Sequence, residues 1–140
     1  MAKFVYPDES DFRSFVGIIK ASNFRIKKYL PPIDDKWYEV ISECVQYVHT
    51  TEHYEDLSFI EVCARILYKV AKRHELGDGN KRSSVMAVYV FCLLNDYYIN
   101  DPQTVKKQAK RVAATKGRLN EATMRKRIAL VLGTVIGNLE

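Results

Sequence analysis

The chain has 140 residues, of which 47% are hydrophobic and 28% charged, and its formal net charge at pH 7 is +5. A chain of this length and composition is expected to form a single domain, residues 1–140, around one core. No apolar run reaches the roughly 18 residues of a membrane-spanning helix, and the N-terminus lacks the apolar segment of a signal peptide. We therefore expect a cytoplasmic protein without contact to a membrane. Cys44, Cys63 and Cys92 lie far apart among apolar residues, which predicts reduced core side chains.

The positive charge is concentrated between Lys106 and Arg127, where nine lysines and arginines accompany the single acid Glu121. Such a segment forms either solvated helix faces or a surface for an acidic protein or an anionic ligand. It contains no recognisable nucleic-acid-binding module and no aromatic stacking platform. Nucleic acid is therefore the least favoured partner.

In chain order, the first predicted helix has an apolar face between Phe12 and Ile19, and Asp8 or Ser10 can cap it. Residues 22–35 contain two consecutive prolines and are expected to form a loop. These two segments should precede the main body of the domain.

The next two predicted helices have long apolar faces. The second carries an apolar stripe from Trp37 to Val48, and the polar residues 50–56 are expected to connect it to the third. Ser58 and Glu61 form the capping-box pattern that begins the third helix, which should end at Lys72 and Arg73.

The fourth predicted helix is almost wholly apolar from Val85 to Leu94, and a helix that is apolar all round is normally buried. Residues 97–99 lie between turn signals as a short extended piece. Pro102 begins a fifth helix that Gly117 would end, and Asn120 can cap a sixth whose inner face consists of Met124, Ile128, Val131, Leu132 and Val135. The fold class is therefore all-α, a compact single-domain helical bundle around a buried central helix.

The polar segment before the central helix combines residues suited to chemistry on phosphate. His74 is a candidate general base because imidazole is divided between its protonation states near neutral pH. Asp78 offers a carboxylate of the kind that holds Mg²⁺ beside nucleotide phosphates. Structural roles remain open for both, since a histidine can cap the end of a helix and an aspartate can cap the start of one.

The following four residues extend this site. Gly79 and Asn80 allow positive or tight backbone dihedrals, which turn consecutive N–H groups toward one anion. Lys81 and Arg82 fall in the first turn of the central helix, where cations oppose the helix dipole and an anionic ligand would offset them. Together these residues predict a site for phosphate transfer.

The segment HELGDGNKR at residues 74–82 resembles the signature of the Fic/Doc family, and lysine at position 81 resembles the Doc (death-on-curing) branch more than the adenylylating Fic branch. FCLLND at residues 91–96 and the segment ending at His74 are also similar, so the resemblance covers about residues 55–100. It implies a Fic/Doc-like domain that acts as the toxin of a toxin–antitoxin system.

The family's roles carry over to the matching residues. The resemblance implies that His74 deprotonates a hydroxyl of a target protein, that Asp78 holds Mg²⁺, and that Asn80, Lys81 and Arg82 bind the phosphates of ATP. The implied enzyme is a kinase that transfers the γ-phosphate to a Ser or Thr hydroxyl. Elongation factor Tu is the implied target, and its modification would arrest translation.

Some positions depart from the family. Leu76 replaces an aromatic residue, Glu75 replaces an apolar residue or proline, and Asp96 replaces a glycine. The segment that forms a flap over the target chain in the family matches residues 51–57. The sequence contains no copy of the inhibitory helix that silences many Fic proteins, which favours control by a separate cognate antitoxin.

Three other interpretations remain. The same site could act as a nucleotidyltransferase that adenylylates a protein hydroxyl, or the chain could be a non-enzymatic interaction module that binds an acidic partner through its basic C-terminal third. His49, Glu52 and His53 also fit the H-x-x-E-H zinc motif. Thr50 and Thr51 adjoin an expected helix end and no third ligand is evident, so the zinc interpretation is the least favoured.

Overall fold

The structure is a computed structural model that describes residues 3–115 and 121–139, apart from the side chains of His53, His74 and Asp78. Over these residues the chain is mostly helical, which confirms the all-α class. The elements are α1 (Glu9–Lys20), the 3₁₀ helix η1 (Arg25–Tyr29), α2 (Asp35–Glu55), α3 (Phe59–Ala71), the 3₁₀ helix η2 (His74–Gly79), α4 (Asn80–Leu94), β1 (Tyr97–Ile99), α5 (Pro102–Ala114), α6 (Glu121–Val135) and β2 (Ile136–Asn138).

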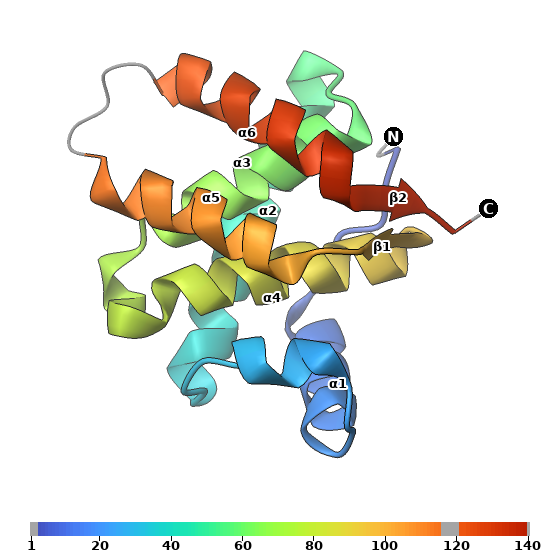
Figure 1. The fold of residues 1–140 in the computed structure, drawn as a ribbon, viewed down its shortest axis with the longest axis vertical. Coiled ribbons are helices and arrows are strands. Elements are labelled where there is room, and N and C mark those ends of the chain that lie inside the picture. Colours follow the sequence, from blue (N-terminus) through green and yellow to red (C-terminus); the bar gives the residue numbers. More distant parts are fainter. Residues whose placement is uncertain (1–2, 116–120, 140) are drawn as a thin grey trace.

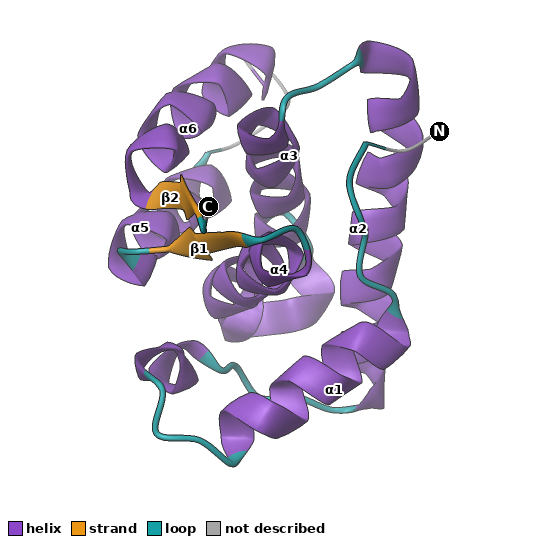
Figure 2. Cartoon of the chain, turned by 90° about the vertical axis from the view of Figure 1, so that its right-hand side faces the viewer, coloured by secondary structure: helices purple, strands orange, loops and turns teal. Residues whose placement is uncertain are grey.

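Helix α4 is the buried central helix that the apolar run predicts. Figures 1 and 2 show α3 and α4 in the middle of the fold, with α2 on one side, α5 and α6 on the other, and α1 packed across one end. The side chains from Val85 to Val88 are fully buried, as is Phe91. The ring of Phe91 stacks on that of Phe59 from α3, with centroids 4.8 Å apart. The middle and second half of α4 are therefore packed in the core.

Local capping signals are confirmed where the sequence places them. The Asp8 carboxylate accepts a hydrogen bond from the Asp11 N–H at the start of α1. Ser58 and Glu61 form the predicted capping box of α3. Helix α5 begins at Pro102, as expected. The expected helix end at Gly117 and the expected cap at Asn120 lie outside the described residues.

The predicted connector at residues 50–56 is wrong, because α2 continues through Glu55. The hydroxyls of Thr50 and Thr51 donate to the carbonyls four residues earlier in the helix, and Glu52 is buried. The helix therefore accommodates the two threonine hydroxyls. Asp56 ends it with a φ of 48°, in the left-handed region.

The expected extended piece at residues 97–99 is β1, which pairs with β2 in an antiparallel register. Its partner is the end of the chain, so no hairpin turn in the sequence could indicate the pairing. Asp96, just before β1, has a φ of 62°, a backbone conformation that glycine adopts without strain.

The cysteines are free thiols in the core, as the sequence predicts. Burial raises the pKa of the Cys63 thiol well above its ordinary value, and a hydrogen bond with Cys92 raises it further. Among the helices that the structure describes, none is long and apolar enough to cross a membrane.

Candidate functional site

The polar motif forms the short connection between α3 and α4. The chain leaves α3 at Lys72, passes through η2, and turns at Gly77, which has a φ of 55° and a ψ of −137°. Gly79 and Asn80, which the sequence suggested for positive or tight dihedrals, instead have φ values of −83° and −63°. The left-handed conformation therefore falls on the first glycine of the motif, which corrects the prediction.

Gly79 has a different relevance, because a distant segment approaches it closely. A Cβ atom at Gly79 would lie 3.1 Å from the Cβ of Pro31, in the loop between η1 and α2. Arg82 binds the same loop, because its Nη1 donates to the Leu30 carbonyl at 3.1 Å. The prolines of the predicted loop thus form a wall beside the start of α4.

The two residues with the most specific predicted chemistry are His74 and Asp78. Their backbones belong to η2, immediately before α4. Their side chains lie outside the described part of the structure, so their predicted roles as base and metal ligand remain predictions. Leu76, between them, is half-buried and packs against the core, as expected for a residue that anchors the loop.

Asn80 ties the end of α3 to the start of α4. Its side chain is 9% exposed, and Nδ2 donates to the Ala71 carbonyl at 2.9 Å. Because this amide nitrogen is already bonded, Asn80 has a structural role that the sequence did not predict. Lys81 and Arg82, both half-buried, remain the cations of the predicted phosphate site.

The start of α4 has the electrostatic character of an anion site. Gly79 occupies the N-cap position, none of the described side chains caps the helix, and its first turn contains no acid. The first N–H groups of a helix have no carbonyl partner within the helix, and they carry partial positive charge. The Asn80 N–H is already bonded to the Gly77 carbonyl, so the following N–H groups are the ones that would face a ligand. Lys81 and Arg82 add two full charges there, and neither forms an ion pair with a described side chain. A phosphate group would complement this charge.

Two serines that the sequence analysis missed hold this first turn in place. Ser83 Oγ accepts a hydrogen bond from Trp37 Nε1 at 2.8 Å and donates one to the Gly79 carbonyl at 2.6 Å. Ser84 Oγ donates to the Asn80 carbonyl at 2.9 Å. The signal available in the sequence was the presence of two hydroxyls at the edge of an otherwise apolar run.

We expect Ser83→Ala to lower the free energy of unfolding by about 1–3 kcal/mol, because it leaves the buried Trp37 indole N–H without an acceptor. Urea denaturation followed by circular dichroism would measure the change. Ser14→Ala removes a hydroxyl from an exposed position of α1 and serves as the matched control, with an expected change below about 0.5 kcal/mol. Equal effects of the two variants would contradict this account of Ser83.

Glu75, one of the departures from the family, faces solvent and is bound by Arg73. The two side chains form an ion pair with Nη2 and Oε2 2.6 Å apart, and Arg73 also bonds to Glu43 of α2. The hydrogen bonds from Arg73 lower the pKa of Glu75 to about 2. The Arg73 guanidinium therefore compensates the charge of Glu75 next to His74.

The Arg73 and Glu75 pair makes a testable prediction about pH. Because the pKa of Glu75 is depressed in the folded state, its contribution to stability is complete above the unfolded pKa of about 4.3 and disappears as pH falls toward 2. NMR titration of the carboxyl carbon should give a pKa near 2, and Arg73→Met should return it to about 4. Arg13→Met, on α1, removes an arginine that pairs with Glu9 and Asp35 instead and should leave it unchanged. A pKa of 4 or above in the unmodified protein would refute the pairing.

The continuation of α2 bears on two further predictions. Residues 51–55, where a flap was expected, are helical, so the flap prediction is wrong for all but the last two residues of that stretch. The H-x-x-E-H motif also lies within the helix, so the expected helix end no longer counts against the zinc interpretation. The ring of His49 stacks on that of Tyr6 at 4.1 Å, and Glu52 is buried beneath the N-terminal segment. No three described His, Cys, Asp or Glu side chains are grouped to hold a metal ion.

Comparisons with models of protein families, with curated proteins and with solved structures found no match to this chain. The resemblance to the Fic/Doc family therefore depends on the motif residues themselves and on their position at the start of the central helix.

Proposed function

We propose that this chain is a Doc-like enzyme that transfers the γ-phosphate of ATP to a Ser or Thr hydroxyl of a target protein. The observation that carries the proposal is the start of α4, where Lys81 and Arg82 lie in a first turn without acids and no described side chain caps the helix. The motif connection that contains His74 and Asp78 leads directly into that turn. A base, a carboxylate and an anion site are thus adjacent along the chain, as phosphate transfer requires.

In the proposed reaction, Lys81 and Arg82 bind phosphate oxygens and orient the γ-phosphate of ATP. His74 accepts the proton of the target hydroxyl as the hydroxyl oxygen forms a bond to the γ-phosphorus. The bond from that phosphorus to the bridging oxygen breaks, and ADP leaves with the electron pair. Asp78 would hold Mg²⁺, whose charge offsets that of the phosphates.

The proposal is tested by incubating the purified protein with Mg²⁺, elongation factor Tu and ATP labelled at either the α- or the γ-phosphate. We expect elongation factor Tu to acquire the γ-label alone, and removal of Mg²⁺ by a chelator to prevent the labelling. Transfer of the α-label would instead support adenylylation, the alternative that the motif leaves open. Absence of both labels would contradict the proposed activity on this target.

ATP binding can be measured separately from transfer. Trp37 is the only tryptophan of the chain, and its indole N–H bonds to Ser83 in the first turn of α4. Its fluorescence should therefore change when Mg²⁺ and ATP bind there. We expect Arg82→Ala to weaken this binding and Arg111→Ala, at an exposed position of α5, to leave it unchanged. A protein that shows neither a fluorescence change nor labelling would favour the non-enzymatic interaction module.

The same proposal includes a cytoplasmic location and a cognate antitoxin. A small protein encoded by a neighbouring reading frame should suppress the labelling when it is added in equimolar amount. If such a protein binds the chain without reducing transfer, control by an antitoxin is refuted while the enzymatic proposal stands.

A further inference from the structure

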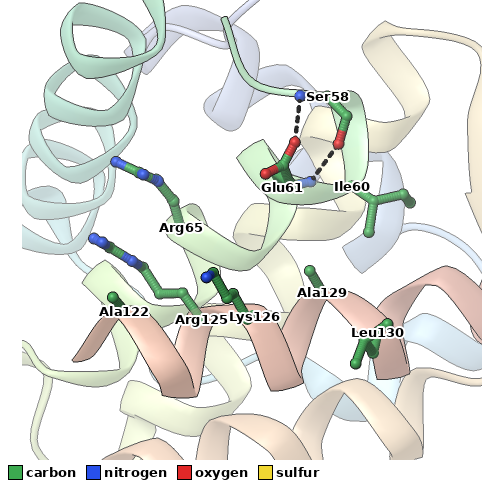
Figure 3. A pocket seen from close by; sticks show the side chains of 9 residues that line it. All are labelled: Ser58, Ile60, Glu61, Arg65, Ala122, Arg125, Lys126, Ala129 and Leu130. Atoms are coloured by element: carbon green, nitrogen blue, oxygen red, sulfur yellow. Dashed lines mark hydrogen bonds between the residues drawn. The ribbon is translucent and has the colours of Figure 1, made fainter. Parts of the chain in front are cut away.

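A groove of about 500 Å³ lies between α3 and α6, separate from the motif (Figure 3). Its lining combines side chains from the first half of α3 and from much of α6. These residues are Ser58, Ile60, Glu61, Arg65, Ala122, Arg125, Lys126, Ala129 and Leu130. Neither the phosphate site nor the packing of the core accounts for this groove.

The groove is polar at one end and apolar at the other. Figure 3 shows Arg65 and Arg125 projecting together at one end, whereas Ile60 and Leu130 lie toward the other. Both helices therefore place their cations at the same end, although each contributes them from a different part of its sequence. Leu130 is 76% exposed and gives the groove an apolar side chain that faces solvent.

The cations that line the groove outnumber the acids that line it. Three cations and the single acid Glu61 line it. The Glu61 carboxylate accepts the Ser58 N–H in the capping box, so it faces the start of its own helix. Arg65 pairs with Glu55, and Arg125 pairs with Glu121 one turn earlier in α6 at 3.5 Å. Lys126 has no ion pair with a described side chain, so it is the cation of the groove that is available to an acidic ligand.

We propose that this groove binds an acidic amphipathic helix of a second protein. A groove between two helices accepts a third helix through its apolar side chains. Lys126 and Leu130 are four residues apart on α6, which separates charge from apolar surface by about 6 Å along the helix. The complementary helix would therefore carry a leucine or isoleucine and an acid three or four positions apart, on one face. The inference is independent of the proposed phosphate transfer.

The probe for this site is a fluorescently labelled, alanine-based helical peptide with two leucines seven residues apart and a glutamate four residues after each. The matched control peptide has lysine in place of each glutamate. Fluorescence anisotropy should show saturable binding of the acidic peptide by the full chain and at least about tenfold weaker binding of the basic one. Equal binding of the two peptides, or binding of neither, would overturn the proposal.

Protein variants locate the binding. Reversing both charges in the double variant Arg125→Glu and Lys126→Glu should weaken binding of the acidic peptide at least about tenfold. The double variant Lys110→Glu and Arg111→Glu changes net charge equally on exposed α5 positions and should change binding by less than about twofold. If both double variants lost affinity for the acidic peptide to a similar extent, the effect would be one of net charge, and the proposed binding site would be refuted. Circular dichroism of each variant verifies the fold, since all four positions are at least partly exposed.

The apolar end of the groove has its own test. Leu130→Asp should also weaken binding of the acidic peptide at least about tenfold, because it removes the exposed apolar contact and adds a charge that repels the peptide. An unchanged affinity would contradict the proposed orientation of the helix. Vesicles containing phosphatidylglycerol are the competing occupant, and binding to these vesicles without binding to the peptide would overturn the proposal in favour of a lipid surface.

Discussion

Replacing His74 with alanine is expected to reduce transfer of the γ-phosphate about 100- to 10 000-fold, which is the usual contribution of a general base. The proposed chemistry needs a group that accepts the proton of the target hydroxyl as the new phosphate ester forms. His74 is the only histidine in the motif, and it lies in η2, which leads into the anion site at the start of α4. The initial rate of labelling of elongation factor Tu measures the effect.

A second histidine provides the matched control for this experiment. His49→Phe removes an imidazole from α2 while preserving an aromatic ring that can stack on Tyr6. This variant should retain labelling within about threefold of the unmodified protein. The fluorescence of Trp37 should still respond to Mg²⁺ and ATP in His74→Ala, because the phosphate-binding residues are unchanged. Full activity of His74→Ala would refute the assignment of the base, and a loss of nucleotide binding would assign His74 to the binding of ATP instead.

The largest expected effect on stability comes from Phe91→Ala, which should lower the free energy of unfolding by about 3–5 kcal/mol. The side chain of Phe91 is fully buried in the central helix. Its ring stacks on Phe59 at 4.8 Å and lies 5.2 Å from the ring of Tyr6. Alanine would leave a cavity among three elements and remove these aromatic contacts. Urea denaturation followed by circular dichroism gives the change directly.

Phe24→Ala is the matched control, because the same substitution is made at a side chain that is 56% exposed. It should change the free energy of unfolding by less than about 1 kcal/mol. A loss below about 1.5 kcal/mol in Phe91→Ala would show that the core relaxes around the cavity, contrary to a rigid central helix. Such a loss would also weaken the argument that α4 is a fixed support for the motif.

The sequence predicted most of the helices because their determinants are local. Capping by Asp8 and the reciprocal bonds of Ser58 and Glu61 join residues three positions apart, so spacing alone indicates them. The burial of α4 followed from its apolar composition on every side. The predicted start of that helix placed Lys81 and Arg82 in its first turn. The anion site that supports the proposed function was predicted from this placement.

Several features of the site could not be predicted, because they depend on segments that are distant in the sequence. Pro31 closely approaches Gly79, and Ser83 is bonded by Trp37, 46 residues earlier. The backbone at the motif placed its positive φ at Gly77, and the amide of Asn80 was committed to the end of α3. None of these contacts leaves a periodic pattern in the residues themselves.

The sequence by itself determined the helical class, the central helix and the composition of the motif, since hydrophobic periodicity and capping act over a few residues. Only the tertiary structure decided that α2 continues through its polar end, because burial of Glu52 depends on the packing around it. It also decided the pairing of β1 with β2, whose hydrogen-bonding partners lie at opposite ends of the C-terminal third. The groove between α3 and α6 also depends on the tertiary structure. Each helix carries cations and apolar residues, and the antiparallel packing of the two helices places Arg65 beside Arg125 and Ile60 toward the same end as Leu130.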